Sequence, residues 1–239
     1  MKRLLAAGYE KIFQISRCWR AGERGILHLP EFTLLEWYRS NSDYLDLMDE
    51  CEALLQSIRR ASGSGEEIFF RGKTVRLSSP WERISVEEAF RRFARIPMRE
   101  ALERRLFDQV MVEEIEPRLG IERPTFIFDY PVERGALARP KKDDPALAER
   151  FELYLAGIEV ANAFSELTDA KEQRIRFESE EAYRRSLSKL PYPVPEKFLT
   201  ELIDMPVSAG IALGVDRLMM LFLDAESIDE VVAFTPEEL

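Results

Sequence analysis

The sequence is poor in the residues that build metal-bound or disulfide-bonded frameworks. Its 239 residues include two cysteines, Cys18 and Cys51, and a single histidine, His28. Two isolated cysteines match no zinc-binding or disulfide pattern, which excludes a cysteine-stapled fold and is typical of a reducing cytoplasm. The chain also has no apolar stretch near the roughly 20 residues that a membrane-spanning helix needs. We therefore expect a cytoplasmic protein that does not enter a membrane.

The chain also has fewer basic than acidic residues. It contains 34 lysine and arginine residues and 44 aspartate and glutamate residues, which gives a net charge of −10. A protein that grips nucleic acid without regard to sequence needs a basic face, so this balance argues against that class. It does not exclude a nucleotide such as ATP, which a few well-placed cations can bind. At this length we expect one large domain, or a domain with an insertion, that buries a substantial core.

Aromatic and β-branched residues cluster in short segments that predict strands, whereas apolar residues at helical spacing predict helices. The predicted strands are 11–20, 31–39, 125–130, 150–167 and 209–215, with a small hairpin over 68–77. The predicted helices begin near Ser42 and otherwise cover 85–93, 98–115, 169–186 and 216–223. Strands in hairpins with helices between them predict an α+β fold on an antiparallel sheet. We interpret 60–120 as a mostly helical insertion or covering layer within a single domain, 1–239.

Two glutamates come together if residues 156–157 form a two-residue turn within 150–167. Tyr154 then pairs with Glu159, and Ala161 lies opposite Glu152. Because side chains alternate along a strand, Glu152 and Glu159 would share one face. Two unpaired carboxylates repel each other, and Mg²⁺, which prefers oxygen ligands and bridges to phosphate, would relieve that repulsion. The alternative is a solvated strand face with ordinary acidic residues.

The first predicted hairpin offers groups that suit a nucleotide. Arg20 ends one strand, His28 lies in the loop, and Phe32 begins the next strand. The arginine fork binds phosphate in a bidentate manner, and an aromatic face can stack on adenine. Taken singly, His28 would be a surface loop residue and Phe32 a core residue.

Glycines in the predicted strand 209–215 indicate the close approach of a ligand or of another backbone. The segment from Gly210 to Arg217 reads Gly-Ile-Ala-Leu-Gly-Val-Asp-Arg, which is neither a phosphate-binding P-loop nor a dinucleotide-binding glycine fingerprint. In isolation, Asp216 and Arg217 would form an ion pair at the start of a helix.

The order of these segments is more specific than any one of them. Arg20, followed by His-Leu-Pro-Glu-Phe-Thr-Leu-Leu-Glu-Trp-Tyr at 28–38, resembles motif 2 of the lysyl-tRNA synthetase family, and 210–218 resembles motif 3. Phe-Glu at 151–152, followed by Gly-Ile-Glu-Val-Ala-Asn-Ala-Phe-Ser-Glu-Leu-Thr-Asp at 157–169, resembles the active-site block that lies between those motifs. This resemblance implies the class II aminoacyl-tRNA synthetase fold, an antiparallel sheet flanked by helices.

The resemblance also implies a role for each matching residue. Arg20 and Arg217 would be catalytic, Glu152 and Glu159 would bind Mg²⁺, and the cofactors would be ATP and Mg²⁺. The residues expected at ATP are Arg20, His28, Phe32, Glu152, Leu153, Glu159, Gly214 and Arg217. Those expected at a lysine-type amino acid are Glu36, Tyr38, Glu159, Asn162, Glu166, Gly210 and Ala212. The reaction would be attack of the amino-acid carboxylate on the α-phosphorus of ATP, followed by transfer of the acyl group.

Ala212 indicates a branch of the family. Lysyl-tRNA synthetases have glycine at this position, and the alanine resembles the ligases that modify elongation factor P and prefer (R)-β-lysine. An extra methyl group would crowd an α-amino group and tolerate one displaced by a methylene. The implied acceptor is then a lysine of elongation factor P, and tRNA binding is not expected. Two alternatives stay open: lysyl-tRNA synthetase-like aminoacylation, and a catalytically weak paralogue that binds ATP or the amino acid.

The chain departs from the family pattern at several places. Motif 1 and a substrate-binding segment would precede Met1, so we expect a homodimer that is weakened by their absence. The usual Arg-x-Glu of motif 2 is Arg-Ala-Gly-Glu at 20–23, so Glu23 would need a shifted loop to take part. Leu29 replaces a usual asparagine, and Ala163 replaces a usual glycine.

Overall fold

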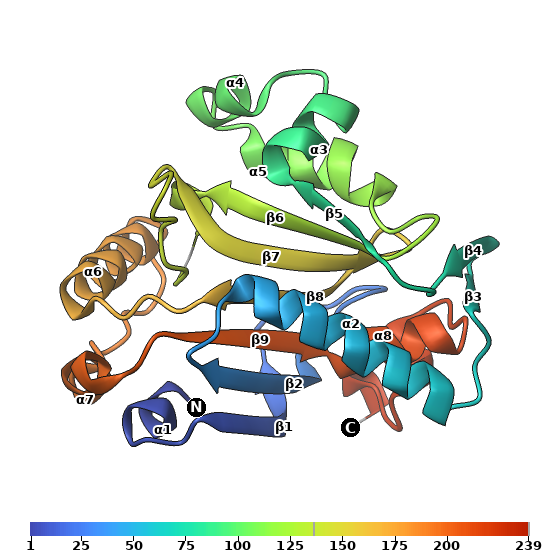
Figure 1. The fold of residues 1–239 in the computed structure, drawn as a ribbon, viewed down its shortest axis with the longest axis horizontal. Coiled ribbons are helices and arrows are strands. Elements are labelled where there is room, and N and C mark those ends of the chain that lie inside the picture. Colours follow the sequence, from blue (N-terminus) through green and yellow to red (C-terminus); the bar gives the residue numbers. More distant parts are fainter. Residues whose placement is uncertain (136, 239) are drawn as a thin grey trace.

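A seven-stranded mixed sheet runs through the computed structural model and includes strands from both ends of the chain (Figure 1). The structure describes residues 1–135 and 137–238. The strands lie in the order β1-β2-β9-β8-β7-β6-β5, and all neighbours are antiparallel except the parallel pair β5 and β6. Their bounds are β1 Lys11–Trp19, β2 Glu31–Ser40, β5 Glu82–Ser85, β6 Thr125–Pro131, β7 Leu147–Leu155, β8 Ile158–Ser165 and β9 Ser208–Gly214. The predicted α+β class on a largely antiparallel sheet is confirmed.

Helices and a separate hairpin surround this sheet. The hairpin is β3 Glu67–Phe70 with β4 Lys73–Arg76, as predicted. The α-helices are α1 Lys2–Ala6, α2 Tyr44–Ala61, α3 Val86–Phe93, α4 Met98–Glu103, α5 Phe107–Val110, α6 Ala170–Ser186, α7 Glu196–Glu201 and α8 Val215–Phe222. Shorter turns are η1 Met111–Ile115, η2 Glu116–Arg118, η3 Val132–Arg134, η4 Leu202–Asp204, η5 Ile228–Val231 and η6 Pro236–Glu238. None of the described helices has the length and apolar character to cross a bilayer.

A capping box begins α2 close to the predicted start. The Asp43 carboxylate accepts hydrogen bonds from the backbone N–H groups of Leu45 and Asp46 at 2.8 and 3.2 Å. The Asp46 carboxylate accepts one in return from the Asp43 N–H at 3.0 Å, so donors on both sides of the helix start are satisfied. The apolar side of α2, which includes Met48 and Leu55, is buried against the sheet.

The prediction of one continuous helix over 98–115 is wrong. The chain leaves the helix after α4 and passes through Arg105, whose φ is 57°, before it continues as α5 and the π turn η1. The break brings Phe107 against Phe90 of α3, with ring centroids 5.2 Å apart. Both Ala101 and Phe107 enter one buried cluster that also contains side chains of β6 and β7, and this packing outweighs helix propensity. Residues 60–120 are also less helical than predicted, because they contribute β3, β4 and β5.

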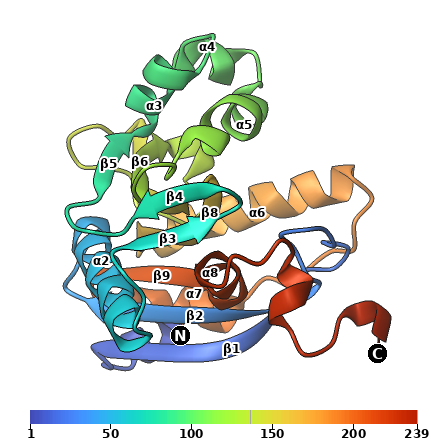
Figure 2. The same cartoon turned by 90° about the vertical axis from the view of Figure 1, so that its right-hand side faces the viewer.

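The two faces of the sheet differ in character. On one face, α2 and α8 pack on apolar side chains of the central strands, including Leu153, Ile211 and Leu213, to form the main core. Figure 2 shows α2 on one side of the sheet, and α6 together with the loop over 20–30 on the other side. The polar side chains of β2, β7, β8 and β9 lie on this second face, and they form the candidate site.

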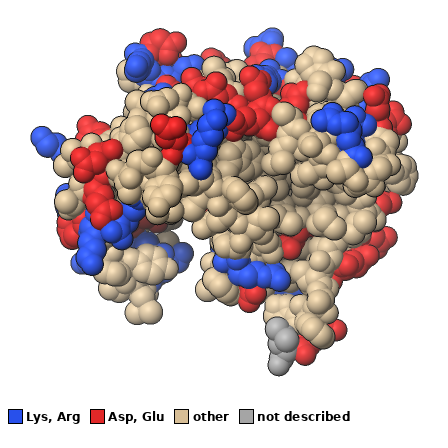
Figure 3. Space-filling model, turned by 60° about the horizontal axis from the view of Figure 1, so that its bottom comes forward, with Lys and Arg blue, Asp and Glu red and all other residues tan. Residues whose placement is uncertain are grey.

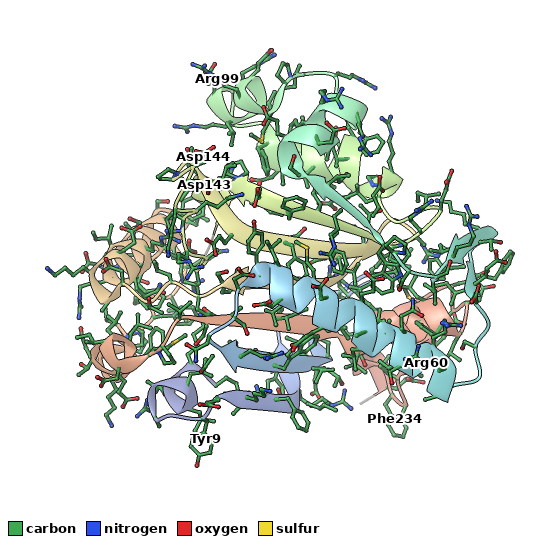
Figure 4. The ribbon with its side chains drawn as sticks, in the orientation of Figure 1. Tyr9, Arg60, Arg99, Asp143, Asp144 and Phe234 are labelled. Carbon is green, nitrogen blue, oxygen red and sulfur yellow. The ribbon has the colours of Figure 1, made fainter. Side chains whose placement is uncertain are left out.

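Several large apolar side chains of the edge strand β1 are exposed on the surface of the protein. Its side chains Phe13, Ile15 and Trp19 are 74%, 65% and 68% exposed. Tyr9 and Phe234 also point outward at the lower border of the molecule (Figure 4). In Figure 3, which looks toward this underside, uncharged atoms fill the middle of the view and charged side chains gather toward its borders.

Candidate active site

Cross-strand register brings residues from three parts of the sequence into one row on the polar face. Glu36 of β2 pairs with Ala212 of β9. Ala212 pairs in turn with Asn162 of β8, which pairs with Glu152 of β7. Residues predicted for the amino acid and for the metal are therefore direct neighbours across the sheet.

A second row on the same face lies two residues further along the strands. Tyr38 pairs with Gly210, and Gly210 pairs with Phe164, two residues before Glu166. A Cβ atom at Gly210 would overlap the Tyr38 ring and would lie 2.7 Å from Glu166 Oε1. Only a residue without a side chain allows Tyr38 and Glu166 to share this space.

Two carboxylates, Glu166 and Glu36, lie along these rows, and the group that they form with Lys2, Tyr38 and Gly210 is called the amino-acid pocket. Glu166 is 1% exposed, and the Lys2 ammonium lies 2.6 Å from its Oε2. Burial raises the pKa of Glu166 to about 7, and the ion pair with Lys2 opposes that rise. Glu36 accepts hydrogen bonds from Gln14 Nε2 at 2.6 Å and from the Tyr38 hydroxyl at 3.4 Å. Burial, helped by both carboxylates, raises the pKa of Tyr38 well above its usual value, so Tyr38 stays a neutral donor.

Lys2 is a pocket residue that the sequence did not reveal. Its local sequence, Met-Lys-Arg-Leu-Leu, is an ordinary short amphipathic run. The packing of α1 places it at the pocket: Leu5 of this helix is buried with Leu202 and Met205. No pattern within residues 1–8 predicts that contact.

The β7–β8 hairpin has the predicted two-residue turn. Residues 156–157 adopt positive φ angles of 53° and 83°, as a turn that matches the twist of antiparallel strands requires. Tyr154 pairs with Glu159, as predicted. The Tyr154 hydroxyl also donates to the Glu152 carboxylate at 2.8 Å, so Glu152 and Glu159 lie on the same face.

The predicted position of Ala161 opposite Glu152 is wrong. A β-bulge shifts the register beyond Tyr154, so Asn162 lies opposite Glu152. Val160 is the extra residue, because a bulge sets two residues of one strand against one of the other. As a result, Asn162 joins both glutamates on the polar face.

The prediction that Glu152 is unpaired is also wrong. Its Oε2 accepts hydrogen bonds from the Tyr130 and Tyr154 hydroxyls at 2.7 and 2.8 Å. Its Oε1 forms an ion pair with Arg150 and accepts a hydrogen bond from Asn162 Nδ2 at 3.3 Å. These partners hold the buried carboxylate in a fixed orientation, so it is not a free strand-face group.

The second carboxylate, Glu159, is less well satisfied. Its Oε2 lies 3.4 Å from Arg217 Nη1, and burial together with the charge of Glu152 raises its pKa to about 7. Burial and Glu152 raise the pKa of Glu116 as well. No described group of three His, Cys, Asp or Glu side chains is arranged to hold a metal ion without other ligands. Binding of Mg²⁺ by Glu152 and Glu159 stays a prediction, and it would need further oxygen ligands, such as those of a phosphate.

Arg217, in the first turn of α8, ties the loop over 20–30 to the sheet. Its guanidinium donates to the backbone oxygens of Glu159 at 2.9 Å and Leu27 at 3.3 Å. Its Nη2 lies 2.7 Å from His28 Nε2. Burial and the positive charge of Arg217 lower the pKa of His28, so the ring is neutral and its Nε2 accepts this hydrogen bond.

Arg20 lies over the aromatic ring of Phe32, with 5.2 Å between its guanidinium carbon and the ring centroid. Arg20 Nη1 is 3.4 Å from Glu23 Oε2, and the side chain is more than half exposed. Glu23 thus reaches the same site despite the extra residue in the motif 2 segment. Because Arg20 forms only this one weak ion pair with the residues that the structure describes, its guanidinium can turn toward a phosphate.

One open pocket collects most of the residues predicted for the nucleotide. Its lining includes the predicted residues Arg20, His28, Phe32, Glu159, Asn162, Ala212, Gly214 and Arg217. Leu27 and Val160 also line it, and the sequence carried no signal for this apolar loop residue or for the bulge. Leu153 pairs with Phe126 and Ala161 and buries its side chain in the core, so its predicted backbone role at the nucleotide remains a prediction.

The chain as a whole matches a known family. The family model of tRNA synthetases class II (D, K and N) matches residues 1–238. The chain belongs to this class II family. The predicted family and its fold are confirmed, and the matching region contains both rows of the polar face.

Three proteins that are similar to this class II chain have the same description. It is 42% identical to an elongation factor P–(R)-β-lysine ligase of Proteus mirabilis. It is 41% identical to proteins of the same description from Photorhabdus laumondii and Klebsiella pneumoniae. Each match covers 98% of this chain and 74% of the relative.

Proposed function

We propose that this class II protein uses ATP to activate a lysine-type amino acid, preferentially (R)-β-lysine, and transfers the acyl group to a lysine of elongation factor P. The observation that carries the proposal is one continuous polar face. On it, the carboxylate pocket of Glu166 and Glu36 adjoins the pocket that contains Arg20 and Arg217. The first pocket suits an ammonium group and the second suits phosphates. The names of the relatives support the same substrate and acceptor.

The residues of this chain would act mainly through position and charge. An oxygen of the amino-acid carboxylate attacks the α-phosphorus of ATP, the bond to the bridging oxygen breaks, and pyrophosphate leaves with the electron pair. Arg20 and Arg217 would stabilise charge on the phosphate oxygens during this displacement. Mg²⁺, held beside Glu152 and Glu159, would neutralise charge on the outer phosphates. Because little proton transfer is needed, alignment of the two reactants supplies much of the rate.

Nucleotide binding would rearrange both arginines. Arg20 would leave the ring of Phe32 as adenine stacks there, and its fork would then reach the α-phosphate. Arg217 would close on the other face of adenine from the first turn of α8. Its present contacts with His28 and Leu27 place it at the rim of the same pocket, which supports this assignment.

In the second step, the neutral amine of the acceptor lysine would attack the acyl carbon. An amide bond forms, AMP leaves, and one proton is released. This product differs from the ester that a tRNA hydroxyl would form. Low affinity for tRNA and formation of a homodimer both stay predictions.

The test of this function is ATP–pyrophosphate exchange by the purified protein. We expect exchange that depends on (R)-β-lysine more strongly than on α-lysine, followed by an acyl-mass increase on elongation factor P. Charging of lysine tRNA, measured in parallel, should be absent. Exchange with neither amino acid by folded protein that binds ATP would contradict the proposed activity, and tRNA charging would favour the synthetase alternative.

Ala212→Gly is expected to improve the use of α-lysine relative to (R)-β-lysine. The methyl group lies on the row between Glu36 and Asn162, where it would crowd an amino group on the α-carbon. One methyl group in a pocket changes discrimination by about 10-fold or more, and the ratio of the two kcat/KM values measures it. Ala209→Gly is the matched control, because Ala209 belongs to the same strand but is buried in the main core. An unchanged ratio in Ala212→Gly would refute the selectivity argument.

A further inference from the structure

We propose that Lys2 is a positioning residue of the amino-acid pocket, which holds Glu166 through Oε2 and leaves Oε1 for the ammonium of the substrate side chain. The proposal deepens the function proposed above and depends on it. Three observations carry it: the position of Lys2, the state of Glu166 Oε1, and the balance of charge in the pocket.

Lys2 is held at the pocket by the protein itself. It opens α1, and its ammonium lies 2.6 Å from Glu166 Oε2 and 5.2 Å from the centroid of the Phe164 ring. The helix is docked independently of this pair, because Leu5 is buried and Arg3 pairs with Glu201, with Nη2 2.6 Å from Oε1. The Lys2 side chain is only 16% exposed, so this ion pair is weakly screened by solvent.

The other oxygen of Glu166 lacks a partner. Both oxygens are buried, and neither accepts a hydrogen bond of ordinary geometry from the residues that the structure describes. Oε2 has the Lys2 ammonium 2.6 Å away as an ion-pair partner, whereas Oε1 has no such partner among those residues. Oε1 faces the bare backbone of Gly210, where a Cβ atom would come within 2.7 Å, and the ring of Tyr38 lies beside the same position. A buried acceptor without a donor is unfavourable. An ammonium group that enters beside Gly210 and Tyr38 would satisfy it.

The charges of the pocket leave room for one cation. When Glu166 is ionised, Glu166 and Glu36 contribute two negative charges, and Lys2 contributes one positive charge. Glu36 accepts hydrogen bonds from Gln14 and Tyr38, and both of these side chains are neutral. One substrate ammonium therefore neutralises the group, whereas loss of Lys2 would leave two carboxylates for a single cation.

The protonation of Glu166 provides a separate readout. Burial raises its pKa to about 7 and Lys2 lowers it, while Tyr38 is a titratable group that faces it from β2. A protonated Glu166 cannot form an ion pair with an ammonium group. In the wild type, the KM for the amino acid should therefore rise as the pH falls through about 7. Without Lys2 the pKa of Glu166 moves further up, so the rise should begin at a higher pH.

The experiment compares Lys2→Met, Lys2→Gln and Lys2→Arg in ATP–pyrophosphate exchange over a range of pH. In the first two variants we expect the amino-acid KM at neutral pH to rise about 10- to 100-fold, the range for loss of a charged hydrogen bond, with the KM for ATP unchanged. The pH at which KM rises should shift upward, and Lys2→Arg should recover much of the loss. Arg3→Met is the matched control, because it removes a neighbouring cation of α1 that pairs with Glu201 instead.

Two outcomes would overturn the proposal. A lower amino-acid KM in Lys2→Met would mean that Lys2 competes with the substrate for Glu166. An unchanged KM and pH profile in folded Lys2→Met and Lys2→Gln, checked by ATP binding, would mean that Lys2 has no part in the pocket. Failure of the proposed function itself is distinguishable, because the wild type would then show no exchange with any lysine-type amino acid.

Discussion

Arg217→Ala is expected to lower the rate of ATP–pyrophosphate exchange by about 10²- to 10³-fold, the range for loss of one preorganised group that stabilises transition-state charge. Arg217 is 19% exposed in its side chain, occupies the first turn of α8, and lines the nucleotide pocket together with Glu159. Removal of its guanidinium would take away both the proposed stacking partner of adenine and the counter-charge of Glu159. Initial rates at saturating ATP and amino acid measure the effect on kcat.

Two further variants separate charge from geometry. Arg217→Lys retains the positive charge but loses the planar fork, so we expect most of the loss to remain. Arg24→Ala is the matched control, because Arg24 lies in the loop over 20–30 that Arg217 contacts but pairs with Asp229 and Glu237 outside the pocket. If Arg217→Ala retained near wild-type exchange while melting normally, the assigned role of Arg217 in activation would be wrong.

Gly210→Ala is expected to abolish useful binding of the amino acid. The added methyl group would overlap the Tyr38 ring and approach Glu166 Oε1 to 2.7 Å, so one of these two side chains must move. Displacement of a positioning group by an ångström costs about 10²-fold, and we expect at least that loss in kcat/KM for the amino acid. Overpacking should also lower the free energy of unfolding by about 1–3 kcal/mol, measured by denaturant titration.

Two controls for Gly210→Ala separate the effect of steric overlap from the loss of groups that bind the amino acid. Gly65→Ala adds the same methyl group where the nearest neighbouring atom is 3.9 Å away, and it should leave exchange and stability unchanged. The double variant Gly210→Ala with Tyr38→Ala should regain stability, because the overlapping ring is gone, but not amino-acid binding. Normal amino-acid KM in Gly210→Ala would show that the glycine is not needed for the pocket.

The hairpin over 150–167 shows which features of the fold can be predicted from local sequence and which cannot. The turn at 156–157 and the pairing of Tyr154 with Glu159 were predictable, because a two-residue turn fixes the register next to it. The bulge at Val160 was not, because it depends on how β8 fits between β7 and β9. It moved Asn162, instead of Ala161, opposite Glu152.

The break in the predicted helix over 98–115 has a similar origin. The sequence favours a helix throughout, yet burial of Ala101 and Phe107 in one cluster requires a change of direction at Arg105. The Glu152 carboxylate likewise looked unpaired in the sequence. Its partner Arg150 stands two positions away on the same strand, and Tyr130 comes from the neighbouring strand, so only the folded sheet supplies them.

The sequence by itself determined the class II family, the order of its motifs, the main strands and the residues predicted for ATP and the amino acid. These features depend on residue type and short spacing, which the chain carries without reference to its packing. The tertiary structure alone decided which groups neutralise one another in the pocket. Lys2 meets Glu166 because α1 docks on η4 and the chain between them is folded into the sheet. Such a contact depends on the relative positions of distant elements, and no local pattern encodes it.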